Sequence, residues 1–188
     1  MIMISRFFLC AVAVLLIGIT PSFAEGAQGY AVVNVDRVMM TSKAAKSIEK
    51  QLKSKSEEYS KEFSKHEREL RQSQEKLIEE NRALGQDASE SKVKNFENKR
   101  KDFEKKMLET QQLFQKRRSS LSKAVNVANT KLQKEMFQTV ADIAEEEQYR
   151  IVFDRKSVVI VEEALDITDR VIKDLDKTIP EIKLDIKK

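Results

Sequence analysis

Residues 84–90, LGQDASE, contain Gly85, and no other glycine or proline lies between Gly29 and Pro180. The stretches on both sides are rich in Lys, Glu, Gln, Ser and Leu. Because Gly and Pro are the residues that most often end helices, this distribution predicts two long helices that fold back on each other at a single turn. A hairpin of this kind favours a function carried by shape and surface over one carried by a catalytic pocket.

Capping residues mark the expected ends of the two helices. Thr41 or Ser42 can cap the first helix. From there to Gly85 is about forty residues, which at 1.5 Å per residue gives an arm of roughly 60 Å. Gly85 is expected to adopt a left-handed conformation after the helix end, and Asp87 with Glu90 resembles a capping box for the return helix.

Heptad spacing predicts that the two helices contact each other as a coiled coil. The residues of this contact line, the seam, recur every seven residues or at three-four spacing. They are Phe63, Leu70, Leu77 and Leu84 in the first helix and Val93, Phe96, Phe103, Met107, Phe114, Leu121, Val125 and Leu132 in the second. Polar residues such as His66, Ser73 and Arg117 also occupy seam positions, so the arm should be only modestly stable and able to splay.

Three β-branched runs predict a small sheet: residues 30–35, 150–153 and 157–161. The last two are expected to form a hairpin with residues 154–156 as its connection. The first run can join them only if the helical hairpin leaves the sheet and returns to it. After the strands, residues 165–175 have an amphipathic helical pattern that ends before Pro180 and should pack on the sheet.

Three short strands leave open edges and little core, and no cysteine follows residue 24 to compensate with a disulfide. We therefore expect other copies of the chain to complete the body. The expected self-association residues are those of the three strands: Val32, Val33, Val35, Ile151, Val152, Phe153, Val159 and Val161.

The first residues have the features of a signal peptide. Arg6 precedes an apolar run over residues 7–19, and a small-x-small cleavage pattern ends at Ala24. The run is shorter than the roughly 20 apolar residues that a spanning helix needs, so cleavage is expected and an uncleaved anchor is the alternative. Cys10, the single cysteine, would be removed with this segment.

Together these patterns predict a mainly α chain with a small β body into which a long antiparallel helical hairpin is inserted. The expected parts are a signal peptide (1–24), a first body segment (25–42), the hairpin arm (43–130, with its tip near 85–89) and a second body segment (131–188).

The residue content argues against catalysis. Charged residues make up 35% of the chain and aromatic residues 6%, which suits an extended coiled coil better than an enzyme core. His66 is the single histidine, and four glycines cannot supply a phosphate-binding loop. We therefore expect no enzyme activity, no cofactor and no metal site.

The predicted arm carries an excess of positive charge. Residues 43–118 contain 21 Lys and Arg against 15 Asp and Glu, whereas the remainder after residue 24 contains 13 against 16. Such an excess is either a well-hydrated face or an attraction for net-negative partners, and the interspersed acids argue against nucleic acid. The basic candidates for contacts to a partner are Lys99, Lys101, Lys105, Lys106, Lys116 and Arg118.

The apolar residues of the arm also allow two interpretations. Phe63, Phe96, Phe103 and Phe114 have the spacing of seam residues. Tyr59 and Met107 lie on or beside the seam, as do Leu108 and Leu113. Where such groups stay partly exposed, they would give weak, unspecific contacts to unfolded chains. The apolar candidates for these contacts are Tyr59, Phe63, Phe96, Phe103, Met107 and Phe114.

The order of segments along the chain matches a known pattern. The strand Ala31-Val32-Val33-Asn34 precedes a charged helical hairpin, which is followed by Ile151-Val152-Phe153-Asp154, by residues 158–161 and by Asp166-Ile167-Thr168 at the start of the last helix. With its exported precursor, this order resembles the Skp/OmpH family of periplasmic chaperones.

The resemblance implies a jellyfish-shaped homotrimer whose three arms enclose a cavity. It also implies an ATP-independent periplasmic holdase that keeps unfolded outer-membrane proteins from aggregating. Members of the family are associated with lipopolysaccharide, although no residues of this chain match a defined lipid-binding motif. An envelope scaffold built on the coiled coil and an anionic glycolipid-binding protein remain the alternative functions.

Overall fold

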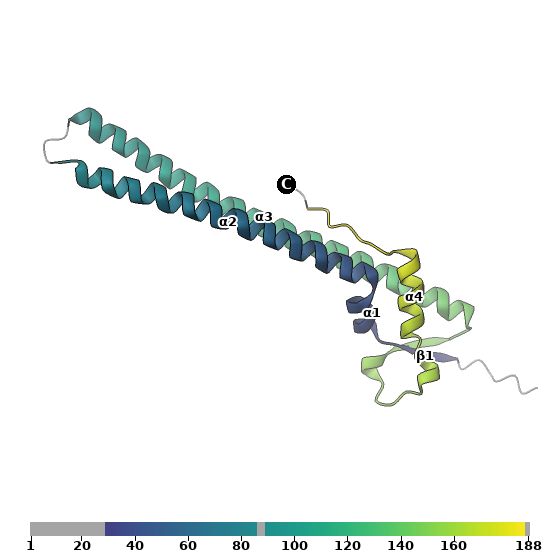
Figure 1. The fold of residues 1–188 in the computed structure, drawn as a ribbon. Coiled ribbons are helices and arrows are strands. Elements are labelled where there is room, and N and C mark those ends of the chain that lie inside the picture. Colours follow the sequence, from purple (N-terminus) through teal and green to yellow (C-terminus); the bar gives the residue numbers. More distant parts are fainter. Residues whose placement is uncertain (1–28, 86–88, 187–188) are drawn as a thin grey trace, which may run out of the picture.

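The computed structural model describes residues 29–85 and 89–186 and consists of a long helical hairpin with a small body at its base (Figure 1). The expected signal peptide and Asp87 lie outside the described residues. The elements, in chain order, are β1 (Tyr30–Val33), α1 (Val35–Thr41), α2 (Lys43–Ala83), α3 (Glu90–Glu146), β2 (Ile151–Asp154), two 3-10 turns (Arg155–Ser157 and Glu163–Leu165) and α4 (Thr168–Thr178).

The hairpin of α2 and α3 is confirmed, and its first helix begins where the sequence predicted. The Ser42 side chain accepts a hydrogen bond from the Ala45 N–H at 3.3 Å and so caps α2. A residue distant in the sequence also helps to cap α2, because the Lys43 N–H donates to a carboxylate oxygen of Asp176 in α4 at 2.6 Å. The base of the arm is thereby tied to the body.

The far end of α2 differs from the prediction. The chain leaves the helix through Leu84 in an extended conformation, with φ −74° and ψ 95°. Neither of the described glycines has a positive φ, so Gly85 does not close the helix with a left-handed residue. On the return side, Ser89 is the N-cap of α3 and its side chain makes no capping hydrogen bond.

The small sheet has two parallel strands in the described part of the chain, and the expected third strand is wrong. β1 pairs with β2 from Tyr30 opposite Ile151 to Val33 opposite Asp154. The hairpin supplies the long connection that parallel strands need. After β2, the Asp154 side chain accepts from the Lys156 N–H at 3.2 Å and starts a 3-10 turn, so residues 158–161 do not fold back as a strand.

Helix α1 replaces the end of the predicted first strand. The predicted strand includes Val35, but Val35 is the first residue of α1. The Asn34 side chain accepts from the Arg37 N–H at 2.9 Å, which caps the new helix and ends the strand at Val33.

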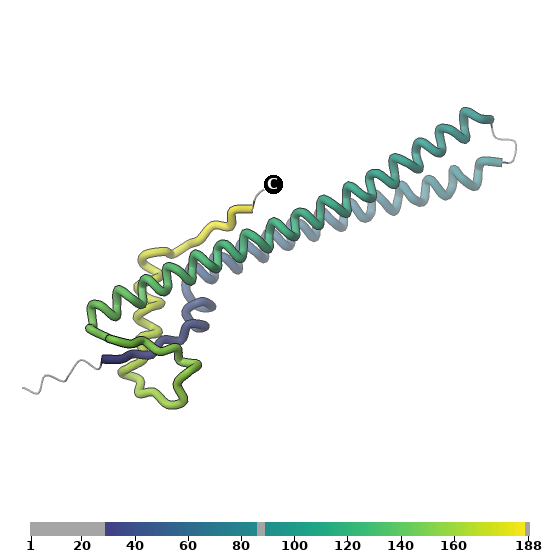
Figure 2. The backbone as a smooth tube through the Cα atoms, turned by 180° about the vertical axis from the view of Figure 1, so that it is seen from behind, coloured from purple at the N-terminus to yellow at the C-terminus, as the bar shows by residue number. Residues whose placement is uncertain are grey.

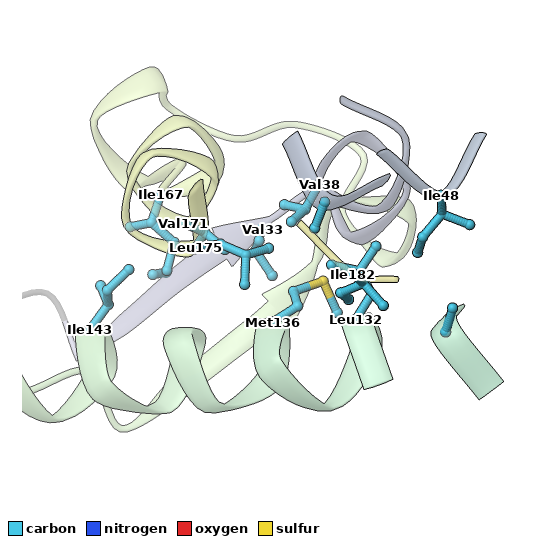
Figure 3. Packing of buried hydrophobic residues seen from close by; sticks show 13 residues of the cluster. Val33, Val38, Ile48, Leu132, Met136, Ile143, Ile167, Val171, Leu175 and Ile182 are labelled. Carbon is cyan, nitrogen blue, oxygen red and sulfur yellow. The ribbon is translucent and has the colours of Figure 1, made fainter. Parts of the chain in front are cut away.

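The core of the body lies where α3 meets α1 and α4 (Figure 3). Leu132 and Met136 of α3 are fully buried and pack in one cluster with Val38 of α1 and with Val171 and Leu175 of α4. Burial of a side chain of this size stabilises the fold by about 1.5–3 kcal/mol. Helix α4 is confirmed as the predicted amphipathic helix. It packs on α1 and α3 more than on the sheet, where the sequence had predicted its contacts.

A buried hydroxyl joins the end of β1 to the start of α4. Thr168 is 1% exposed, and its Oγ1 accepts a hydrogen bond from the Asn34 N–H at 2.8 Å. The same hydroxyl donates to the Asp166 carboxylate, which also accepts from the Thr168 N–H at 2.9 Å. The segment Asp166-Ile167-Thr168 therefore satisfies the backbone at a junction between two distant parts of the chain.

Residues 179–186, which we call the strap, follow α4 in a stretch for which the sequence predicts no helix or strand. They leave α4 and run in an extended conformation along the base of the hairpin toward its tip (Figures 1 and 2). Ile182 is 4% exposed and belongs to the core cluster. Leu184 packs against the same cluster, so the strap is an integral part of the fold.

Candidate functional site

The middle of the arm is held by aromatic contacts across the seam. The rings of Phe63 in α2 and Phe114 in α3 meet edge to face with centroids 5.0 Å apart. His66 lies against the same Phe114 ring at 5.7 Å. Edge-to-face pairs are worth about 0.5–1.5 kcal/mol beyond the burial of their area, so these contacts hold the two helices together at this point.

Arg117, predicted to weaken the seam, has a set of partners in α2. Its guanidinium lies over the Tyr59 ring, 5.1 Å from the centroid, and also 5.6 Å from the centroid of Phe114. It forms an ion pair with Glu62. A guanidinium can stack on aromatic rings while it pairs with a carboxylate, which allows a charged residue at this seam position.

Between these aromatics and the tip, ion pairs join the two helices alongside half-buried seam residues such as Leu77 and Phe103. Lys99 of α3 pairs with Glu80 of α2 at 2.6 Å, and Lys106 pairs with Glu69 at 3.5 Å. Exposed ion pairs typically contribute only about 0–1 kcal/mol, so the outer part of the arm is held more weakly than the base.

The predicted basic residues fall into two groups. Lys99 and Lys106 are engaged across the arm, and Lys105 pairs with Glu109 of its own helix at 3.9 Å. Lys101, Lys116 and Arg118 form no ion pair within residues 29–85 and 89–186 and are exposed. Closer to the arm base, the pKa of Lys55 is raised, chiefly by its hydrogen bond to Glu58 at 2.6 Å. Lys101, Lys116 and Arg118 therefore carry positive charge that no acidic side chain among the described residues pairs with.

The predicted apolar contact residues divide in a similar way. Phe63 and Met107 are 47% and 49% exposed although both lie at or beside the seam. Tyr59, Phe96, Phe103 and Phe114 are half-buried between the helices. Leu108 and Leu113, which also lie beside the seam, are 52% and 36% exposed. The arm thus presents several large apolar side chains to solvent within a strongly charged surface.

A shallow hollow between the helices accompanies this surface. Its volume is about 320 Å³. The side chains around it come from both helices and are mostly charged, with two apolar residues among them. They are Ser73, Lys76, Leu77, Glu80, Lys99, Asp102, Phe103 and Lys106.

The predicted self-association residues of the body are partly buried and partly exposed. Val32 and Val33 are 3% and 4% exposed, so their side chains already pack within their own chain. Val35, Val152 and Val161 are half-buried. Ile151, Phe153 and Val159 are exposed, with Val159 at 93%.

These exposed residues have apolar neighbours. Tyr30 stands opposite Ile151 in the sheet and is itself exposed, and Ile160 follows Val159 at 87% exposure. The body therefore has several large apolar side chains that the described residues leave exposed.

Sequence reasoning missed a groove at the base of the arm, between the strap and α3. It was missed because the strap's place against the helices depends on contacts between residues far apart in the chain. Two strap residues, Ile182 and Lys183, form part of its wall.

Two further observations concern chemistry and membranes. Among residues 29–85 and 89–186, no three metal-ligating side chains come together in a cluster that could hold an ion. None of the helices in that same part of the chain combines the length and the apolar character needed to cross a bilayer.

The fold is similar to a solved structure. A crystal structure from Caulobacter crescentus CB15, provisionally assigned as an OmpH-like outer membrane chaperone, superimposes with a TM-score of 0.74. It covers 85% of this chain and 90% of its own, at 19% sequence identity. A likeness at this identity establishes the shared fold. No curated protein matched the chain.

Sequence comparison covers the same elements. Residues 29–175 match the family described as Outer membrane protein (OmpH-like), a span that begins just before β1 and ends within α4. The match includes the whole hairpin and the two-stranded sheet, and it stops before the strap. The chain therefore belongs to the OmpH-like family of outer membrane proteins.

Proposed function

We propose that this protein is an ATP-independent holdase chaperone of the periplasm that binds unfolded outer-membrane proteins and prevents their aggregation. Membership of the OmpH-like family and the fold shared with a chaperone candidate of that type support this function. The main observation behind this proposal is the surface of α3 in the arm, which combines exposed apolar side chains with basic side chains that form no ion pair in the described residues. The apolar residues are Met107, Leu108 and Leu113, and the basic ones are Lys101, Lys116 and Arg118.

This combination suits weak binding to many unfolded chains. Scattered apolar groups contact exposed apolar segments without demanding one sequence, and Met adapts its shape to different neighbours. The excess positive charge raises the association rate with net-negative partners. The client contacts in this proposal are made by Tyr59, Phe63, Phe96, Phe103, Met107, Phe114, Lys99, Lys101, Lys105, Lys106, Lys116 and Arg118.

The proposal includes assembly into a homotrimer after removal of residues 1–24. Tyr30, Ile151, Phe153 and Val159 are exposed apolar residues of the body that other copies can cover. Three arms attached to one body would enclose a cavity for the client. The weakly held outer parts of the arms would let this cavity adapt to clients of different size.

The test is to dilute a urea-denatured β-barrel membrane protein into buffer with and without this protein and to follow turbidity. The holdase function predicts lower turbidity without added ATP. The double variant Met107→Ser and Leu113→Ser should suppress turbidity less well, whereas the control Phe137→Ser, which removes an apolar residue of the body that is 53% exposed, should act as the wild type does. Turbidity unchanged by the wild-type protein would contradict the proposal.

The uncompensated lysines and arginine on α3 also suit an anionic glycolipid such as lipopolysaccharide as a second ligand. Exposed charges are screened by salt, so such binding should fall steeply between low and high ionic strength. Lipopolysaccharide micelles titrated with the wild type and with Lys101→Glu and Arg118→Glu test this point. Equal affinity of the wild type and the two variants would exclude this ligand at these residues.

A further inference from the structure

The groove between the strap and α3 has a volume of about 880 Å³. Its floor is formed by small and apolar side chains of α3, and the strap forms its opposite wall. The lining residues are Lys116, Ser120, Lys123, Ala124, Val127, Ala128 and Lys131 of α3 together with Glu181, Ile182, Lys183 and Asp185 of the strap.

The strap has one paired and one unpaired backbone edge. On the α2 side, the Gln51 amide donates to the Ile182 carbonyl at 2.8 Å and accepts from the Leu184 N–H at 3.0 Å. Side chains alternate along the strap, with Ile182 buried, Leu184 half-buried and Lys183 exposed, as they do along a β-strand. The peptide groups of Lys183 and Asp185 therefore face the opposite side, toward α3 and the groove.

That second edge has no partner among residues 29–85 and 89–186. The N–H groups of Lys183 and Asp185 donate to no acceptor in this part of the chain. An exposed row of unpaired peptide groups is a template for pairing with another extended backbone. The groove beside it has an apolar floor that includes Val127, which is 68% exposed.

The charge of the groove selects among extended chains. Four lysines, Lys116, Lys123, Lys131 and Lys183, face two carboxylates, Glu181 and Asp185. The three lysines of α3 have no ion-pair partner in the described residues. Net positive charge around an apolar floor favours a segment that carries both apolar and acidic side chains.

We propose that this groove binds an extended client segment with alternating apolar and acidic residues, which pairs with the free edge of the strap as an added β-strand. The inference rests on the proposed chaperone function, for which it names a second contact site and the class of segment bound there. Main-chain hydrogen bonds would give sequence-tolerant affinity, and the apolar floor and lysine rim would give the preference. A lipid acyl chain could occupy the floor but has no groups that pair with the strap.

The probe is a fluorescein-labelled peptide of nine residues in which Val and Glu alternate. A matched peptide carries N-methyl groups on every second residue, which removes the N–H donors along one edge while it leaves charge and composition unchanged. Binding to the full chain is followed by fluorescence anisotropy. Because the strap includes core residue Ile182, deletion of the strap could unfold the body, so surface substitutions are used instead.

The groove variant is Lys123→Glu with Lys131→Glu, and its control is Lys92→Glu with Lys94→Glu near the tip. All four lysines are exposed and lack an ion-pair partner in the described residues, and the two double variants change net charge equally. The proposal expects binding of the probe about tenfold weaker in the groove variant and unchanged in the control. It expects the N-methylated peptide to bind the wild type about tenfold more weakly than the probe.

Several results would overturn the inference. Equal binding of the two peptides would exclude strand pairing, and equal weakening by both double variants would place the site elsewhere. Binding of phosphatidylglycerol vesicles without binding of the probe would assign the groove to a lipid surface. A lower light-scattering mass of the groove variant would assign the groove to contact between copies.

The turbidity test separates this inference from the proposed function. If the wild type keeps the denatured β-barrel protein in solution but does not bind the probe, the groove is not a client site and the holdase function stands. If the wild type neither suppresses turbidity nor binds the probe, both fail.

Discussion

The amide of Gln51 in α2 takes the place of a β-strand neighbour for Ile182 in the strap. Its Nε2 donates to the Ile182 carbonyl at 2.8 Å, and its Oε1 accepts from the N–H two residues further along at 3.0 Å. One side chain thus satisfies two backbone groups on the same edge of an extended segment. This contact fixes the strap against the base of the arm.

Replacement of Gln51 by Ala should release the strap. Both hydrogen bonds are lost together, and the Ile182 carbonyl is left without its partner beside a buried side chain. The expected loss in free energy of unfolding is about 1–3 kcal/mol. Urea denaturation measures it, and hydrogen exchange at the Leu184 amide should become faster. Gln111→Ala, an exposed position on α3, is the control and should change stability by less than about 0.5 kcal/mol.

Replacement of Thr168 by Val should destabilise the junction between β1 and α4. Val keeps the shape of the side chain but removes the hydroxyl that accepts from the Asn34 N–H, so a part-buried donor loses its acceptor. The expected cost is about 1–3 kcal/mol in the free energy of unfolding, measured by thermal or urea denaturation. Thr130→Val, at an exposed position where the hydroxyl bonds within its own helix, should cost much less. Equal effects of the two would mean that the buried hydrogen bond contributes little.

A double-mutant cycle on Phe63 and Phe114 should reveal direct coupling across the arm. The rings touch edge to face, so the second Phe→Ala change should cost less than the first, with a coupling energy of about 0.5–1.5 kcal/mol. Hydrogen exchange of amides in the arm measures the local stability without requiring global unfolding. A cycle that pairs Phe63 with exposed Leu108 is the control, and additive effects in both cycles would contradict the contact.

The stability of the α4 region should fall at low pH because the charge of Asp174 is lost there. The hydrogen bond from Lys177 at 2.7 Å, with Arg170 close by, lowers the pKa of Asp174 below its ordinary value of 3.8. A lowered pKa in the folded state means that the stabilisation is present above pH 3.8 and is lost as pH falls through the folded value.

Thermal melting from pH 7 down to pH 2 compares the wild type with Asp174→Asn. The variant should be less stable at pH 7, and the difference should shrink below pH 3.8. A difference that stays constant over this range would show that protonation of Asp174 does not matter. Because Asp174 is about one-third exposed, the effect should also weaken at high salt.

Substitution of Phe153 by Asp should lower the mass of the assembly. Phe153 of β2 is 43% exposed, and a carboxylate there would be buried without a partner wherever another copy covers it. Light scattering at micromolar concentration should show a trimer for the wild type and a smaller species for the variant. Leu108→Asp, which introduces the same charge on the arm, should leave the mass unchanged. A monomeric wild type would contradict the trimer itself.

Local signals predicted the parts of the fold that local interactions decide. Ser42 caps α2 because its hydroxyl reaches a peptide group three residues away, and capping patterns describe contacts of this range. The amphipathic pattern that placed α4 is local in the same sense. The predicted left-handed conformation of Gly85 is wrong, because a glycine permits that conformation without requiring it.

The errors in the body came from residues whose partners are distant. The run of β-branched residues at 157–161 has high strand propensity, yet the Asp154 side chain starts a 3-10 turn and leaves Val159 in solvent. The β-branched neighbours of Val35 predict a strand there, whereas the Asn34 side chain caps a helix that begins at Val35. Among the candidate client residues, heptad spacing predicted those that lie at the seam. It could not predict which lysines pair with α2, because these ion pairs depend on the register between the two helices.

The sequence by itself determined two long helices with one turn between them, an impure seam and an excess of positive charge on the arm. These features follow from periodicity, capping and composition, in which each interaction joins residues within one or two turns. The tertiary structure decided the parallel pairing of β1 with β2, the place of the strap and the groove beside it. The contact of Gln51 with Ile182 spans 131 positions, and no local preference encodes a partner at that distance. Such contacts form only after the hairpin has brought the ends of the chain together, because packing of the body then offsets the entropy of ordering them.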